Sequence, residues 1–187
     1  MARIRSVYIA GPQLHPARAE PLADDARLLC EAAGFEPVTA EPGPLTESDP
    51  SEAMAREIYA SRLSRMRVAD AAILDLTPFR GPNCDPAAAF DAGFFAGVGK
   101  PVFAYMNVPT EYEAELSGRV EAYAGAEVDE SGVMRDVNGS PVEDYGLPES
   151  LMLWAEARRL YVIVTPNPES DLTGLQLCLD AVKLYAD

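Results

Sequence analysis

Three aspartates lie near the point where an expected strand ends and the next helix begins, and carboxylates there can carry out sugar chemistry. Asp75 lies in an apolar run, Asp85 follows in a polar loop, and Asp91 falls in the helix beyond it. A carboxylate can attack an anomeric carbon, and its anion can stabilise an oxocarbenium-like transition state, so glycosyl transfer needs no other residue type. The plainer explanation for each aspartate is a helix N-cap or a surface acid.

The spacing of Asp85 and Asp91 decides whether they can act together. If both were helical they would be separated by roughly 600°, at about 100° per residue, and would not need to share a face. If Asp85 instead lies near the N-cap and Asp91 lies further into the helix, both carboxylates can point into the same crevice.

The surrounding residues predict a βαβ unit of a parallel sheet. An apolar run at 71–76 is followed by a Gly/Pro loop, a helix of small residues, a Gly-Lys-Pro stop and a second apolar run at 101–105. This order of strand, loop, helix and strand is typical of parallel sheets. Ligands of such units bind where the loop leaves the carboxyl end of the strand, so we expect the site there.

The rest of the chain continues the alternation of strands and helices. The further elements that we expect are strands at 5–10 and 35–38, helices at 21–33, 51–68 (capped by Ser51), 150–154 and 172–185, and a turn or small hairpin at 127–141. Residues 160–164 fit either a strand or the tail of the preceding helix. The pattern predicts one α/β domain over residues 1–187, with a doubly wound parallel sheet.

Charge and composition exclude several classes of partner. The chain has 15 Lys and Arg against 30 Asp and Glu, a formal net charge of −15, which repels nucleic acid phosphates and anionic lipid surfaces. No apolar run approaches the roughly 18 residues of a membrane span, and the first residues lead into a strand rather than a signal peptide. Cys30, Cys84 and Cys178 are widely spaced and fit free thiols. We therefore expect a soluble, cytoplasmic protein that binds neither a nucleic acid polymer nor a membrane.

Other kinds of site find little support. His15 is the one histidine, so a Ser-His-Asp triad would have to use it, and a solvated loop histidine is the alternative. No His/Cys cluster and no group of carboxylates predicts a metal site. Neither a Gly-x-Gly-x-x-Gly motif nor a Walker loop follows the first strand, which argues against dinucleotide and triphosphate binding.

Several segments, taken together, resemble the nucleoside 2-deoxyribosyltransferase family. They are Val7–Pro12, Ala69-Asp70 with Asp75, Phe79–Gly81 leading to Asp85, Asp91-Ala92-Gly93, Gly99–Val102, and Val142–Leu147 with Leu151–Leu153. The resemblance implies a flavodoxin-like α/β fold with about five parallel strands and a double displacement at the anomeric carbon. A carboxylate takes the 2-deoxyribosyl group from one nucleoside, forms a covalent intermediate, and passes the sugar to a second nucleobase or to water. No cofactor is implied.

The resemblance also implies roles for particular residues. By motif position, Asp91 matches the family's nucleophile, Asp85 matches the acid that meets the sugar 5′-hydroxyl, and Tyr8 matches the tyrosine of the pocket floor. The strand-exit carboxylate Asp75 is a further catalytic candidate. The remaining candidates for substrate binding are Gly11, Gly81, Asn83, Asp144 and Ser150. The last two lie in the stretch that resembles a part reaching into a neighbouring active site, so a homodimer or higher homo-oligomer with shared sites is implied.

Three positions depart from the family pattern. The nucleophile is usually Glu, and Asp91 is one methylene shorter, which moves the carboxylate back by about 1.5 Å. A misplacement of that size can lower a rate on the order of a hundredfold. Arg62 stands where the family usually carries a base-protonating Asp, and Ser150 replaces an Asn supplied by the partner subunit.

These departures leave two alternatives to deoxyribosyl transfer. Ser150 is similar to the serines of the related deoxynucleoside 5′-monophosphate N-glycosidases, and Arg62 could pair with a phosphate, so hydrolysis of a nucleotide or modified nucleoside is the first. Asp85 favours a free nucleoside instead, because a carboxylate at the 5′ end repels a phosphate dianion. The second alternative is a nucleoside-binding protein that has lost catalysis.

Overall fold

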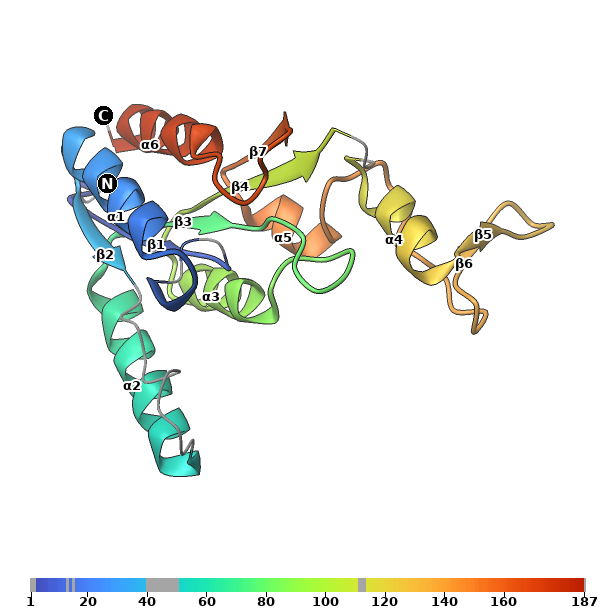
Figure 1. Ribbon diagram of the computed structural model, residues 1–187, viewed down its shortest axis with the longest axis horizontal. Helices are drawn as coiled ribbons and strands as arrows, with labels where there is room; N and C mark the ends of the chain where they lie inside the picture. The colour runs from blue at the N-terminus through green and yellow to red at the C-terminus, as the bar shows by residue number, and fades with distance from the viewer. Residues whose placement is uncertain (1–2, 13, 15, 40–50, 111–113, 187) are drawn as a thin grey trace.

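A central sheet with helices on both sides dominates the computed structural model of the chain (Figure 1). The structure describes residues 3–12, 14, 16–39, 51–110 and 114–186. His15 lies outside the described residues. None of the described helices is long and apolar enough to span a membrane.

Five parallel strands form the sheet in the order β2-β1-β3-β4-β7. They are β1 (Ser6–Ala10), β2 (Glu36–Thr39), β3 (Ala71–Asp75), β4 (Val102–Pro109) and β7 (Arg159–Thr165). The chain passes from β1 to β2 on one side and then returns to β3 on the other, so the strand order reverses beside β1. The doubly wound parallel sheet predicted from the sequence is therefore confirmed, and its switch point lies at the carboxyl ends of β1 and β3.

Two helical layers cover the sheet because successive strand residues point to opposite faces. Val7 and Ile9 pack with residues of α1 and α6, whereas Tyr8 and Ala10 pack with residues of α2, α3 and α5. The described helices are α1 (Pro16–Ala32), α2 (Glu52–Val68), α3 (Pro86–Gly97), α4 (Leu116–Ala124), α5 (Leu151–Glu156) and α6 (Thr173–Ala186). Burial on both faces is expected of a parallel sheet.

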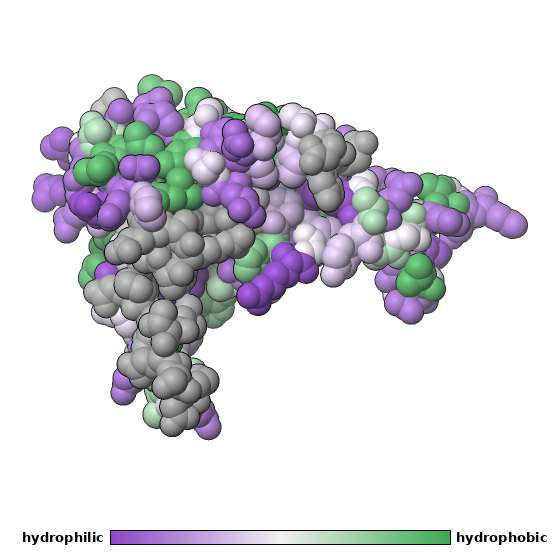
Figure 2. All heavy atoms as spheres, viewed as in Figure 1, coloured by the Kyte–Doolittle hydropathy of each residue, from purple (hydrophilic) through white to green (hydrophobic). Residues whose placement is uncertain are grey.

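An excursion between β4 and α5 extends away from the sheet (Figure 1). It contains α4 and the antiparallel hairpin of β5 (Glu127–Val128) and β6 (Met134–Arg135). Asp129 holds the turn, since its carboxylate accepts from the backbone N–H of Ser131 and from Arg135 Nε at 2.6 Å. On the face shown in Figure 2 the excursion is hydrophilic with patches of hydrophobic residues, and Val128 and Val137 are exposed. The hairpin predicted at 127–141 is confirmed.

Helix and strand boundaries test the local predictions. The Ser51 side chain caps α2 by accepting from the Met54 N–H at 3.2 Å, as predicted. Residues 160–164 belong to the strand β7, which pairs with β4. Helix α1 begins at Pro16 and contains Pro21, so the predicted start at residue 21 was wrong. Proline suits the first turn of a helix because it lacks an N–H. In the structure Pro16, rather than Pro21, occupies this first turn.

Helix α6 approaches β4 closely at a glycine. A methyl group on Gly174 would come within 2.5 Å of the side chain of Tyr105, which is buried in the core. Gly93 in α3, by contrast, has no such neighbour within 4 Å. The close packing of α6 on the sheet therefore requires glycine at position 174.

We expect Gly174→Ala to lower the free energy of unfolding by about 1–3 kcal/mol, which is the usual cost of overpacking a core. Gly93→Ala is the matched control, because its methyl group has room and alanine is the better helix former by about 1 kcal/mol. Urea denaturation measures both. Wild-type stability in Gly174→Ala would contradict the close approach of α6 to Tyr105.

Candidate active site

Asp91 is carried by α3, the helix of small residues that follows β3. Asp85 caps this helix, since its Oδ1 accepts from the Ala87 N–H at 3.1 Å. Ala88 and Ala92 are buried against the sheet, and their small side chains let the helix lie close to it. Asp85 therefore lies at the N-cap and Asp91 further into the helix, which is the arrangement that lets both carboxylates face one region.

The Asp91 carboxylate is fully buried and accepts three hydrogen bonds. The Tyr8 hydroxyl donates to Oδ2 at 3.0 Å. Arg62 donates from Nε to Oδ1 at 2.9 Å and from Nη2 to Oδ2 at 2.5 Å. Asp91 is 0% exposed and the Arg62 side chain is 26% exposed, so Arg62 is the member of this ion pair that reaches solvent.

Three elements supply this cluster, which we call the Asp91 cluster: Tyr8 from β1, Arg62 from α2 and Asp91 from α3. The Tyr8 ring packs on Phe95 of α3 with 5.5 Å between ring centroids. Nη2 of Arg62 also donates to the carbonyl oxygen of Ala87 in α3, at 3.5 Å. The cluster therefore ties α2 and α3 to the same face of the sheet.

Burial and neighbouring charges act in opposite directions on the ionisable groups of the cluster. The pKa of Asp91 is raised by burial and by the charge of Asp85. Arg62 and Tyr8 lower it, and the net shift of the pKa is upward. Burial lowers the pKa of Arg62, but the hydrogen bond to Asp91 and the negative charges of its neighbours raise it, so the net shift of the pKa is upward. Burial, reinforced by the charge of Asp91, raises the pKa of Tyr8, so its hydroxyl keeps its proton and donates to Asp91.

Asp75 lies on the opposite face of the sheet from Asp91. Ile73 packs in the α1 and α6 layer and Leu74 in the other layer, so the alternation along β3 turns Asp75 toward α1 and α6. Its Oδ1 accepts from Thr77 N at 2.9 Å and from Thr77 Oγ1 at 2.5 Å. A methyl group on Gly11 would lie 2.8 Å from the Asp75 backbone oxygen. Asp75 and Gly11 therefore fix the ends of β3 and β1 against each other, and the structure does not bring Asp75 together with Asp91.

The loop after β3 is held by two buried charges that the sequence analysis did not single out. Glu149 accepts from the Cys84 N–H at 3.1 Å and from the Ser150 N–H at 2.8 Å. Arg119 of α4 donates to the carbonyls of Pro82 at 2.8 Å, Ala114 at 2.7 Å and Pro148 at 2.6 Å. Since these partners are backbone groups, and those in the loop after β3 are far from Arg119 and Glu149 in the chain, no motif or spacing in the sequence marks either residue.

The other predicted binding residues lie at the borders of this region. Asn83 is exposed, and its carbonyl accepts from the Phe79 N–H at 2.9 Å. Asp144 is exposed, and Ser150 precedes α5 without a capping bond from its side chain. None of the three contacts Asp91 in the described hydrogen bonds.

Two cavities lie near these residues. The smaller, of about 200 Å³, is lined by Tyr59, Arg62, Leu63, Met66, Ala87 and Phe90. Arg62 lines this cavity, whereas Asp91 does not. The larger, of about 380 Å³, is lined in part by Gly81 and lies at the ends of β3 and β4. Within the described residues, no group of three or more His, Cys, Asp or Glu side chains could hold a metal ion.

Removing Arg62 should expose the cost of burying Asp91. We expect Arg62→Leu to lower the free energy of unfolding by about 3–5 kcal/mol near pH 7.5, because the carboxylate loses its partner charge. Without Arg62, the folded-state pKa of Asp91 rises further above its unfolded value. Stability is then fully present below the unfolded pKa and is lost as the pH rises through the folded pKa. Urea denaturation at several pH values measures this dependence.

Arg56→Leu is the control, because Arg56 lies on the same helix in an exposed ion pair with Glu52, and such pairs contribute little. The double variant Arg62→Leu/Asp91→Asn should recover part of the loss, since the amide carries no charge. If Arg62→Leu were as stable as wild type near pH 7.5, Asp91 would not depend on Arg62 for charge compensation.

Comparisons with known proteins agree with this fold. A family model described as nucleoside 2-deoxyribosyltransferase matches residues 7–152. An uncharacterised protein of Schizosaccharomyces pombe is 27% identical over 159 residues, which are 80% of this chain and 75% of that protein. The solved 2-deoxyribosyltransferase from Leishmania mexicana is 29% identical, covers 80% of this chain and 85% of its own, and superposes with a TM-score of 0.56.

A conserved protein from Enterococcus faecalis V583, 17% identical, shares the fold over 97% of this chain and 99% of its own with a TM-score of 0.53. The family resemblance noted in the sequence is therefore confirmed by an independent match that spans most of the chain. By the match over residues 7–152, this chain belongs to the nucleoside 2-deoxyribosyltransferase family.

Proposed function

We propose that this protein transfers a 2-deoxyribosyl group between nucleobases through a covalent intermediate on Asp91. Family membership supports glycosyl transfer. The observation that carries the residue assignment is the buried Asp91 carboxylate, held by Tyr8 and Arg62 at the position of the family's nucleophile.

The proposed reaction has two displacements at the anomeric carbon. In the first, an Asp91 oxygen bonds to this carbon while the bond from the carbon to the base nitrogen breaks, and the departing base keeps the electron pair and takes up a proton. In the second, a nitrogen of another base loses its proton and displaces the Asp91 carboxylate. Oδ2 accepts hydrogen bonds from Tyr8 and Arg62. Among the described contacts, Oδ1 accepts one hydrogen bond, from Arg62 Nε. We therefore assign the attack to Oδ1.

Arg62 has to move before Asp91 can attack, because its guanidinium occupies both carboxylate oxygens. The side chain is partly exposed and lines the 200 Å³ cavity, so its end can turn away while the core stays packed. A guanidinium keeps its protons at neutral pH, so it cannot replace the acid that would protonate a departing base. We therefore expect the best substrates to carry bases that leave readily.

We also propose that Asp144 and Ser150 act in the site of a neighbouring subunit, as the family resemblance implies. Asp144 is exposed, and the Ser150 side chain is free of a capping bond to α5. In this arrangement the protein works as a homo-oligomer.

Hydrolysis of a nucleotide or modified nucleoside is the second candidate, and the position of Arg62 favours it. Water as the acceptor requires no second base, and a guanidinium that swings away from Asp91 can pair with a phosphate. Faster base release from deoxynucleoside monophosphates than from nucleosides would support this candidate, and the opposite preference would count against it. A nucleoside-binding protein without catalysis would instead show a raised melting temperature and no product.

Incubation of the protein with deoxyinosine and free adenine or cytosine tests the transferase directly. We expect a new deoxynucleoside of the added base, because the glycosylated Asp91 can be attacked by that base. Chromatography separates the nucleosides and free hypoxanthine. If neither exchanged nucleoside nor released base were formed, the glycosyl-transfer proposal would fail for these substrates, and release without exchange would favour hydrolysis.

Asp91→Asn should lose essentially all turnover while it folds normally, because the amide has nearly the same shape but no anionic oxygen. Asp180→Asn removes an exposed carboxylate of α6 and serves as the control. Asp91→Glu is informative in both directions: higher activity indicates the usual family geometry, and lower activity indicates a backbone suited to the shorter acid. Wild-type turnover in Asp91→Asn would rule out Asp91 as the nucleophile and make Asp85 the next carboxylate to test.

A further inference from the structure

The sheet has two edge strands, and they differ in length and in cover. β7 has seven residues and β2 has four. In β4, which has a strand on each side, residues 102–108 are all buried. In β7, residues 160–163 are only partly buried and Val164 is 58% exposed. The outer side of β7 therefore lacks the cover that a central strand receives.

Half of the main-chain groups of β7 point away from the sheet. The Arg158 N–H donates to the Val102 carbonyl at 2.8 Å, and along a parallel strand every second residue bonds to the neighbour. The residues that point outward are Arg159, Tyr161, Ile163 and Thr165. Within the described part of the chain, their N–H and C=O groups have no backbone partner. β7 therefore offers a row of free donors and acceptors along its outer side.

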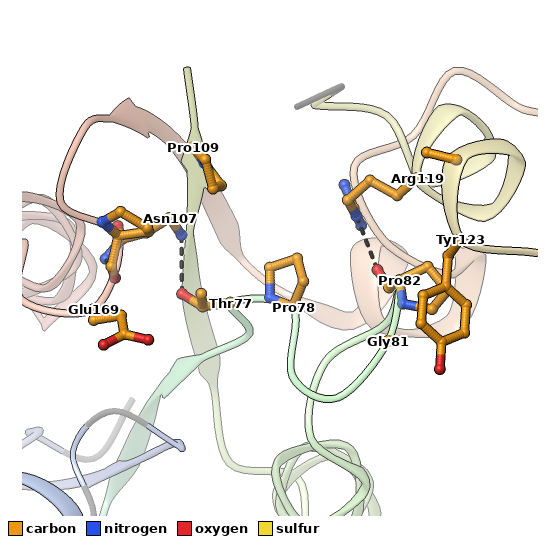
Figure 3. A pocket seen from close by; sticks show the side chains of 11 residues that line it. Thr77, Pro78, Gly81, Pro82, Asn107, Pro109, Arg119, Tyr123 and Glu169 are labelled. Carbon is orange, nitrogen blue, oxygen red and sulfur yellow. Dashed lines mark hydrogen bonds between the residues drawn. The ribbon is translucent and has the colours of Figure 1, made fainter. Parts of the chain in front are cut away.

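The loop that follows β7 turns back across β4 (Figure 3). Asn107 of β4 donates from its side chain to the carbonyls of Pro168 and Asp171, both at 2.9 Å. Glu169 lies beside Asn107 at the larger cavity. These contacts hold the loop over β4 rather than along the outer side of β7.

The opposite edge of the sheet is protected against pairing. The Glu36 N–H donates to the Arg5 carbonyl at 2.9 Å, so Glu36 faces β1 and the next residue, Pro37, turns its main chain outward. Proline has no N–H, and proline and short length are two ways in which proteins stop an edge strand from pairing with another chain. β7 is longer and has neither proline nor lysine. This contrast indicates that β7 pairs with a strand of a partner.

The sequence of β7 fits pairing with a second copy of itself. In an antiparallel pair centred on Val162, each of the seven residues lies opposite a residue of the other copy. Tyr161 and Ile163, whose main-chain groups point outward, then form hydrogen-bonded pairs. Leu160 lies opposite Val164. Aromatic, β-branched and aliphatic side chains in such cross-strand pairs stabilise neighbouring strands.

The charges of β7 favour the antiparallel direction. Arg158 and Arg159 lie together at its start, so a parallel pair would place four like charges side by side. In the antiparallel pair the two arginine pairs are separated by about 20 Å, at roughly 3.3 Å per residue. This separation exceeds the screening length of about 8 Å at physiological salt.

From these observations we propose that two copies of this protein associate through β7, with the strands antiparallel about a two-fold axis at Val162. The pairing joins the two five-stranded sheets into one. It uses neither the Asp91 cluster nor Asp144 and Ser150, so the proposal holds whether or not the protein transfers a deoxyribosyl group.

Cross-linking tests the pairing and its register. The two Val162 Cα atoms would lie about 4.5 Å apart in the dimer, which suits a disulfide, whereas the two Val164 residues would be about 14 Å apart. We expect Val162→Cys to form a disulfide-linked dimer on oxidation with copper phenanthroline in air, and Val164→Cys to stay unlinked on a non-reducing gel. The native cysteines Cys30, Cys84 and Cys178 are buried, so wild type is the blank.

The absence of a cross-link in Val162→Cys, or equal cross-linking of both variants, would overturn the proposal. Circular dichroism of each variant before oxidation checks that it is folded.

Sedimentation velocity measures the dimer itself. The net charge of −15 opposes association at low salt, so the experiment is run at physiological salt. We expect a wild-type dimer, and we expect Val164→Lys to raise its dissociation constant about tenfold or more, because each lysine would lie against Leu160 of the other copy. Val164 is exposed, so the folded monomer accepts the lysine.

Val68→Lys is the matched control, since Val68 is 68% exposed at the end of α2 and should leave the dissociation constant unchanged. A wild-type monomer at about 100 µM, or a dimer that Val164→Lys leaves intact, would show that β7 is not the interface.

Discussion

A carboxylate that is wholly buried has to be paired with a positive charge or with hydrogen-bond donors, and Asp91 imposes this requirement on the structure. The chain meets it with groups from two other elements, the Tyr8 hydroxyl from β1 and the Arg62 guanidinium from α2. Both elements must therefore lie close to α3. The small side chains Ala88 and Ala92 make that approach possible, since larger ones would hold the helix away from the sheet.

The same pairing limits the chemistry. Arg62 favours the ionised form of Asp91, which a nucleophile needs, yet its two hydrogen bonds engage both oxygens. The shorter side chain also makes the carboxylate harder for a substrate to reach, because aspartate keeps its carboxylate about 1.5 Å further back toward α3 than glutamate would. Arg62 is the member of the pair that reaches solvent. Two of the three departures from the family pattern, Asp91 and Arg62, thus form one interaction in the structure and have to be considered together.

Local features of this fold could be read from the sequence, and contacts between distant elements could not. The strand, loop and helix around Asp85 follow from hydrophobic runs and turn residues, and the Ser51 cap follows from a local side-chain bond. The pairing of Arg62 with Asp91 joins residues on two helices, and neither residue type at its position predicts the other. Asp75 was grouped with Asp91 because both follow the pattern of strand-exit carboxylates, but the alternation along β3 places them on opposite faces.

The loop that follows β3 lines the larger cavity and leads into α3, which lines the smaller one, and contacts at its start, middle and end hold it in place. At its start, Asp75 binds Thr77, whose Oγ1 accepts from the Asn107 N–H at 3.0 Å, so the loop is tied to β4. At its end, Asp85 caps α3, the helix that carries Asp91. Arg119 and Glu149 hold the middle through backbone groups. Because Thr77 and Arg119 hold the loop and also line the larger cavity, the residues that position Asp85 and the Asp91 helix are in part the residues that shape that cavity.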